Sequence, residues 1–288
     1  MPNNNSENKS TAEDSENQIA HQTQPWTDET VSLFWKYENT HVREDSFYFS
    51  HQCGPALIML AKEFKLLQGS VLDYSAARGH LSNKLLDESS ITVEAVEYTD
   101  EAVNALNKKF QDRDGWNRAS LFYDWIQKES GQYDLIFCIE VIEHLLGDYL
   151  ESTIKSFYDC LQPGGSVLFT TPNEEHLKDH FAFCPFCRTE FHPVQHVRSF
   201  SKESLTESLT QAGFEVKYCQ SMNLMTLADC LNPNSWKMSR YNYLKMQLIH
   251  RYIKIMDAIA PGKKSRLVQW VEQYQGPHLL AVATKPAL

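Results

Sequence analysis

Residues 70–97 combine a small-residue turn with acidic side chains. Val71 and Leu72 are apolar and lead into Asp73, and the turn at 75–79 ends at Gly79. Leucines then follow at helical spacing, and a second apolar run at 91–96 ends at Glu97. The pattern predicts a strand, a tight loop, a helix and a strand. In such a unit the loop lets a ligand approach the backbone, and the acid binds ribose hydroxyls. The stretch therefore predicts a nucleoside site.

Other polar side chains follow the predicted neighbouring strands. Asp124 comes just after an apolar run at 119–123, and Glu140 and His144 come after a longer run at 133–139. Further strands are predicted at 166–171, 214–219 and 278–284, with helices between them. Strands that alternate with helices indicate an α/β protein with a mostly parallel sheet. Ligands of such sheets bind at the carboxyl ends of the strands, so these side chains are expected to converge there.

Four short motifs resemble those of class I S-adenosylmethionine (SAM) dependent methyltransferases. They are DYSAARG at 73–79, CIEVIEH at 138–144, LQPGG at 161–165 and TPN at 171–173, and over about 70–220 they are similar to the ubiquinone-biosynthesis-like branch. The family usually carries D-x-G-x-G-x-G, and here Ser75 and Ala77 replace the first two glycines. The resemblance implies a Rossmann-like, seven-stranded, mostly parallel sheet with the last strand antiparallel. N-terminal helices and a helical insertion before the last strand would be added to it.

The resemblance also implies SAM as cofactor and a set of residues that bind it. Asp73 and Gly79 would lie near its methionine part, Glu97 on the ribose and Asp124 beside the adenine. The full set expected to bind the cofactor is Asp73, Ser75, Ala77, Gly79, Glu97, Tyr98, Asp124 and Ile139.

His144 and Glu140 are the predicted catalytic residues. Methyl transfer from a sulfonium is an in-line displacement, but a hydroxyl acceptor must also lose its proton, and a histidine suits that step. The two residues are four apart, which on a helix would place them on one face. His144 would act as a base or orient the substrate; alternatively, it fixes the helix over the sheet. We expect O-methylation of a small or carrier-linked molecule; the alternative is a non-catalytic binding or regulatory module with an eroded cofactor site.

Cys184, Cys187, His192 and His196 form a candidate metal site. Two thiolates in a C-x2-C pair and two imidazoles supply the four ligands of a tetrahedral zinc ion. Two alternatives are reduced thiols without metal and a redox-active pair. His196 precedes a segment that resembles one in the same methyltransferase branch, so it could instead face the substrate.

Composition predicts a disordered tail at 1–24. The resemblance implies an N-terminal helical cap at 25–69 and a methyltransferase domain at 70–288. Within that domain, 176–200 would be a zinc knuckle or lid loop and 222–276 a helical insertion. The formal net charge of −10 disfavours a nucleic-acid partner. No apolar run approaches the ~20 residues of a membrane span, and a cytoplasmic protein is expected.

The insertion holds eight basic residues and one acid between 236 and 266. An apolar stripe runs along its expected helix, with residues at spacings of three and four. The insertion could cover an anionic or lipid-linked acceptor, form a homodimer interface or contact a membrane surface.

Overall fold

The computed structural model describes residues 22–23, 25–41, 44–126, 131–231 and 276–287, together with eight positions between 241 and 269. Most of the tail predicted at 1–24 and most of the insertion predicted at 222–276 lie outside the described residues. The division into domains stays a prediction.

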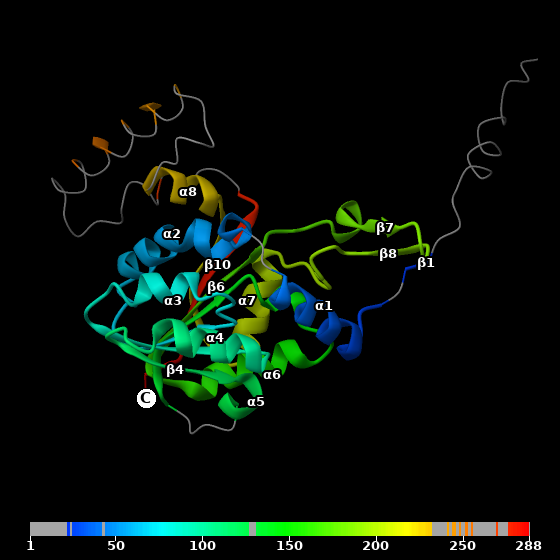
Figure 1. Ribbon diagram of the computed structural model, residues 1–288. Coiled ribbons are helices and arrows are strands. Elements are labelled where there is room, and N and C mark those ends of the chain that lie inside the picture. Colours follow the sequence, from blue (N-terminus) through cyan, green and yellow to red (C-terminus); the bar gives the residue numbers. More distant parts are fainter. Residues whose placement is uncertain are drawn as a thin grey trace, which may run out of the picture.

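A seven-stranded sheet forms the centre of the molecule (Figure 1). Its spatial order is β4-β3-β2-β5-β6-β10-β9, and β10 runs antiparallel to both of its neighbours while the other adjacent pairs are parallel. This confirms the predicted architecture. The strands are β2 (Gly69–Tyr74), β3 (Ile91–Glu97), β4 (Trp116–Leu121), β5 (Tyr133–Ile139), β6 (Leu161–Pro172), β9 (Glu215–Met222) and β10 (His278–Thr284).

Helices cover both faces of this sheet, and each face has its own hydrophobic cluster. Val71 and Leu72 of β2 are both fully buried, and they belong to different clusters because successive side chains of a strand point to opposite faces. One face is covered by α2 (Phe49–Glu63), α3 (His80–Leu85), α4 (Asp100–Phe110) and α8 (Leu224–Leu231). The other is covered by α5 (Phe122–Trp125), α6 (Tyr149–Cys160) and α7 (Lys202–Gln211). Burial on both faces explains the uninterrupted apolar runs of the central strands.

The backbone after β5 differs from the prediction. Only the short 3-10 helix η2 (Ile142–His144) forms there. Glu140 has a φ of 52° and Val141 a φ of −129°, and neither value belongs to an α-helix. The prediction that Glu140 and His144 share one helical face is therefore wrong.

The N-terminal segment reaches the carboxyl edge of the sheet. Helix α1 (Asp28–Thr40) begins with a capping box at Thr27, and a 3-10 helix, η1 (Asp45–Phe47), precedes α2. The indole Nε1 of Trp35 donates a hydrogen bond of 2.8 Å to Gln195 Oε1. Helix α1 is thereby joined to the chain that follows β6.

A second, three-stranded sheet forms an arm that extends away from the main sheet (Figure 1). It consists of β1 (Gln22–Thr23), β7 (Ala182–Cys184) and β8 (Thr189–Phe191), and the 3-10 helix η3 (Leu177–His180) precedes β7. Strands β7 and β8 pair antiparallel as a hairpin, and β1 lies parallel to β8. None of the helices described by the structure combines the length and the apolar character needed to cross a bilayer.

Candidate active site

The loop after β2 follows the path of a glycine-rich loop although it holds one glycine. Ser75, Ala77 and Gly79 have φ values of 62°, 50° and 70°. The left-handed region costs about 1–2 kcal/mol for a residue with a Cβ, so the surrounding contacts must hold the loop in place. The N–H of Ser75 donates to the carbonyl of Val96 at 2.9 Å, and the N–H of Ala77 donates to the Glu97 carboxylate. The loop is thus tied to the end of β3.

Glu97 is the acidic residue on which this loop closes. Its side chain is buried, and burial raises its pKa to about 7, although the N–H groups of Ala77 and Tyr98 partly oppose this shift. The Ala77 N–H donates to Oε1 and the Tyr98 N–H to Oε2. Each carboxylate oxygen can accept a second hydrogen bond, so the acid can still receive a pair of hydroxyls.

Asp73 has a structural partner. Its Oδ2 accepts a hydrogen bond of 2.5 Å from the Ser82 hydroxyl, which joins β2 to α3. Only 3% of Asp73 is exposed, and burial raises its pKa to about 6. This hydrogen bond joins the two elements on either side of the loop. Direct binding of the cofactor by Asp73 stays a prediction.

The remaining predicted cofactor residues lie at neighbouring strand ends. Ile139 ends β5, one residue past Cys138, which pairs with Tyr74 of β2. Tyr98 is 46% exposed, and its ring centroid lies 6.3 Å from that of Tyr123. Asp124 follows Tyr123 and is exposed in α5. The structure thus places these residues along one edge of the sheet, and their contact with SAM stays a prediction.

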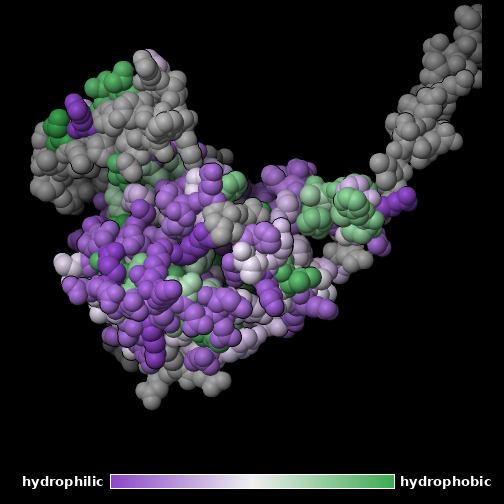
Figure 2. All heavy atoms as spheres, in the orientation of Figure 1, coloured by the Kyte–Doolittle hydropathy of each residue, from purple (hydrophilic) through white to green (hydrophobic). Residues whose placement is uncertain are grey.

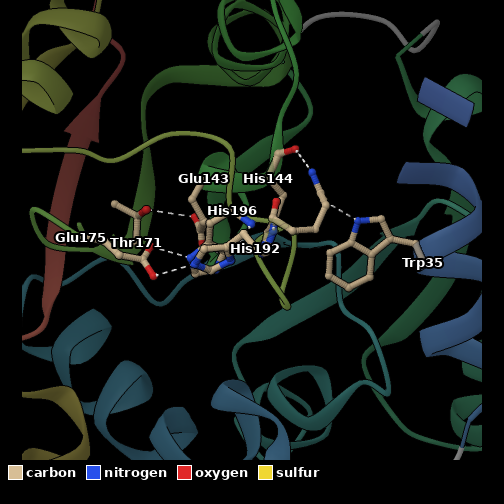
Figure 3. A network of polar contacts seen from close by, with 8 residues as sticks. Trp35, Glu143, His144, Thr171, Glu175, His192 and His196 are labelled. Atoms are coloured by element: carbon tan, nitrogen blue, oxygen red, sulfur yellow. Dashed lines mark hydrogen bonds and ion pairs between the residues drawn. The ribbon is translucent and has the colours of Figure 1, made fainter. Parts of the chain in front are cut away.

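A cluster of acids and histidines follows β5 and β6 (Figure 3). Glu143 is 1% exposed, and its Oε2 accepts a hydrogen bond of 2.9 Å from the Thr171 hydroxyl. The other oxygen, Oε1, has no hydrogen bond and lies 3.8 Å from His144 Nε2. Burial raises the pKa of Glu143, and the nearby Glu140 carboxylate raises it further. Glu140 is itself buried at Oε1, and burial raises its pKa to about 7.

His144 is packed between aromatic rings. The centroid of its ring lies 5.1 Å from that of the Trp35 indole, in an edge-on contact, and 4.8 Å from that of the His196 imidazole. Burial, and then the charge of His196, lowers the pKa of His144 to about 3. His144 is therefore neutral near pH 7, and such a weak base removes a hydroxyl proton poorly.

Glu175 holds the two histidines of the loop after β6 (Figure 3). Its Oε2 lies 2.5 Å from His196 Nδ1 and its Oε1 lies 3.3 Å from His192 Nε2. The two imidazole rings stack at 4.6 Å with an angle of 16° between their planes. The Nδ1 of His192 accepts the backbone N–H of His196, which leaves the proton of the neutral ring on Nε2, facing Glu175.

The four predicted zinc ligands do not come together. His192 and His196 turn toward Glu175, while Cys184 and Cys187 lie in the hairpin of β7 and β8. Among the described side chains, the groups whose ligand atoms lie within 4.8 Å of one another contain neither cysteine. Those groups are Glu143, His144 and His196; Glu175, His192 and His196; and Asp45, His51 and His80. The predicted Cys2His2 arrangement is therefore wrong for a single chain.

Three residues of this cluster were not predicted from the sequence: Glu143, Glu175 and Gln195. Glu143 stands directly before His144, at the end of a buried strand, and that position could have indicated it. Glu175 follows the TPN motif at the end of β6. Gln195 lies far along the chain from Trp35 and His144, both of which it contacts, and no local pattern points to it.

A family model described as a methyltransferase domain matches residues 45–218, which is more than half of the chain. The chain belongs to this methyltransferase family. It is a class I methyltransferase, and its cofactor is SAM. Membership of the ubiquinone-biosynthesis-like branch stays a prediction. Among curated proteins, none matches the sequence significantly.

Solved structures show that this methyltransferase shares its fold with proteins of different activities. A chain solved in complex with the Haloferax volcanii Trm112 methyltransferase activator is similar at a TM-score of 0.55 and 15% identity, over 90% of this chain and 98% of that one. The [4+2]-cyclase SpnF is similar at a TM-score of 0.52 and 16% identity, over 82% of both chains. Phosphoethanolamine N-methyltransferase 2 from Haemonchus contortus was solved with SAM. It is similar at a TM-score of 0.50 and 15% identity, over 90% of this chain and 57% of that one. At these identities the likeness shows the fold alone.

The residues of this methyltransferase fit the cofactor. The left-handed loop at 75–79 is tied to Glu97, whose two carboxylate oxygens each accept one backbone N–H and have the capacity for a second hydrogen bond. Hydroxyl donors from a ribose would stabilise the charged form of this buried acid and lower its raised pKa.

Proposed function

We propose that this methyltransferase transfers the methyl group of SAM to a hydroxyl oxygen of a small or carrier-linked acceptor. Bound SAM supplies an electrophilic methyl group on a sulfonium. The chain must then hold the acceptor oxygen in line with the breaking bond and exclude water. The observation that carries the proposal is the group formed by the buried Glu143 and the half-buried His144, which follow β5, and the half-buried His196 of the loop after β6.

This group is suited to orienting a hydroxyl. Ligand atoms of its three side chains lie within 4.8 Å of one another, and Glu143 Oε1 has no hydrogen bond. A carboxylate beside two imidazoles is a ligand set for a divalent cation. Such a cation would lower the pKa of an acceptor hydroxyl, which the neutral His144 cannot do alone. We therefore assign His144 to orientation of the acceptor rather than to proton removal.

A carrier-linked acceptor is supported by the described positions of the insertion. Five of its apolar side chains are exposed: Tyr241, Leu244, Leu248, Tyr252 and Ile255. Lys245 and Arg251 are exposed in the same helical segment. An exposed apolar stripe beside bases is typical of surfaces that bind a lipid with an anionic group.

The non-catalytic alternative is not favoured. Ser75 and Ala77 replace two glycines of the family motif, but both adopt the left-handed conformation that glycine would supply. Membership of the methyltransferase family also favours an enzyme.

The test combines SAM binding with methyl transfer. Calorimetry measures SAM affinity, and labelled SAM is then incubated with small alcohol, phenol and amine acceptors, with and without Mg²⁺, Mn²⁺ or Zn²⁺. The proposal expects labelled methyl ethers and stimulation by one of these cations. Glu143→Gln should abolish the stimulation of methyl transfer by the cation. It should also abolish any rise in melting temperature that the cation causes, while its affinity for SAM should equal that of the parent. Glu174→Gln, at an exposed neighbour of Glu175, is the control and should behave like the parent. Methylation of amines alone, or transfer that is indifferent to both cation and Glu143, would refute the proposal.

A further inference from the structure

The arm formed by β7 and β8 presents two thiols at its end. Cys184 pairs with Thr189 in the last register position of the hairpin, and Cys187 lies in the exposed turn between the strands. Phe186 stands between the cysteines and is 96% exposed. The arm projects from the body (Figure 1), and Figure 2 shows hydrophobic side chains gathered on it.

The turn holds the thiols together. The N–H of Arg188 donates to the carbonyl of Cys184 at 2.8 Å, and Arg188 has a left-handed φ of 56°. Cys184 and Cys187 therefore lie at the two ends of one short turn. A C-x2-C pair closed by such a turn provides two of the four sulfur ligands of a tetrahedral zinc ion.

The same chain offers no further thiol for this site. The other five cysteines of the sequence, Cys53, Cys138, Cys160, Cys219 and Cys230, are buried in the main body. His192 and His196 are held by Glu175. Among the described residues, no group of three ligand side chains contains Cys184 or Cys187. Within the part of the chain that the structure describes, two of the four coordination positions therefore have no ligand.

We propose that the hairpins of two copies of this chain bind one zinc ion between them, with Cys184 and Cys187 of each copy as ligands. The four thiols lose their protons to solvent as the four zinc–sulfur bonds form. The resulting centre has a net charge of −2, and Arg188 of each copy brings one positive charge beside it. The two exposed Phe186 rings would meet near the metal and be removed from water. With the ligands that the described residues supply, the site is incomplete without the second copy.

Elemental analysis and mass measurement test this proposal together. Protein purified without a metal-affinity resin should contain about one zinc ion per two chains and should migrate as a dimer by light scattering. A chelator should convert the dimer to monomer, and Zn²⁺ should restore it. Replacement of zinc by Co²⁺ should give the visible absorption of a tetrathiolate site.

Variants separate the metal site from general damage to the fold. Cys187→Ser should be monomeric and free of zinc, and Cys53→Ala, at a buried cysteine, should remain a zinc-containing dimer. Both should bind SAM with the affinity of the parent, which makes this test independent of the proposed acceptor. One zinc ion per monomer, a reduced protein that takes up no zinc, or a dimer that survives both the chelator and Cys187→Ser would overturn the proposal.

Discussion

Replacement of Ala77 by glycine is expected to stabilise this methyltransferase. Ala77 has a φ of 50°, a conformation that costs about 1–2 kcal/mol for a residue with a Cβ. Glycine removes this strain but is freer in the unfolded chain, which offsets about 0.4–1 kcal/mol. The net gain in the free energy of unfolding is then about 0.5–1 kcal/mol. For a protein of this size it corresponds to a rise in melting temperature of about 1–3 °C.

Ala76 provides the matched control in the same loop. It is 4% exposed and is not among the residues with positive φ, so Ala76→Gly has no such strain to relieve. It should lower the stability by about 0.5–1 kcal/mol. Ser75 has a φ of 62°, and Ser75→Gly should therefore change stability in the same direction as Ala77→Gly.

Urea denaturation and thermal melting of the three variants measure these differences. The N–H that residue 77 donates to Glu97 is retained in Ala77→Gly, so its affinity for SAM should not fall. The reasoning fails if Ala77→Gly is no more stable than Ala76→Gly. It would also fail if the glycine variant bound SAM more weakly, since the loop would then depend on the alanine side chain.

Three further predictions concern the carboxylate of Glu97 and the contact of Trp35. Glu97→Gln should weaken SAM binding by about 10- to 100-fold, because hydrogen bonds to a charged acceptor are lost. Calorimetry measures the affinity, and the control Glu101→Gln, at an exposed position of α4, should bind SAM like the parent. Burial raises the pKa of Glu97 from 4.5 to about 7, so between these pH values the folded protein binds more protons than the unfolded chain. The free energy of unfolding of the SAM-free protein should therefore fall as the pH rises from about 4.5 to about 7. Urea titrations across that range should show a shallower decline in Glu97→Gln; an equal decline would assign the effect to other acids. Trp35→Phe removes the donor to Gln195 Oε1 and leaves that buried oxygen unpaired, so it should lower stability by about 1–3 kcal/mol without changing SAM affinity.

Much of the sheet could be predicted because its strands are buried on both faces. Such strands appear in the sequence as short apolar runs, and the run at 133–139 coincides with β5. The segment after β5 could not be predicted in this way. Helical spacing from Glu140 to His144 assumes a continuous helix, whereas the backbone turns to a positive φ at Glu140. The spacing of hydrophobic residues does not indicate a single residue in the left-handed conformation.

The spacing of the cysteines and histidines gave a wrong prediction of a Cys2His2 site for a related reason. Spacing reports how far apart ligands are along the chain but not where each side chain points. Cys184 and Cys187 are carried outward by the hairpin, while His192 and His196 return to the edge of the main sheet. Their partner, Glu175, lies before the hairpin, so the contact depends on how the whole loop folds back.

The electrostatics of the strand ends favour positively charged ligands. Glu97 is the last residue of β3, and Glu140 and Glu143 follow β5; burial raises the pKa of each. A buried carboxylate without a compensating charge is unstable in its ionised form, so a cation bound nearby would be strongly stabilised. SAM carries a positive sulfonium, and the ligand set of Glu143, His144 and His196 suits a divalent cation. The acids therefore make this edge suited to bind the methyl donor and, as proposed above, a divalent cation beside it.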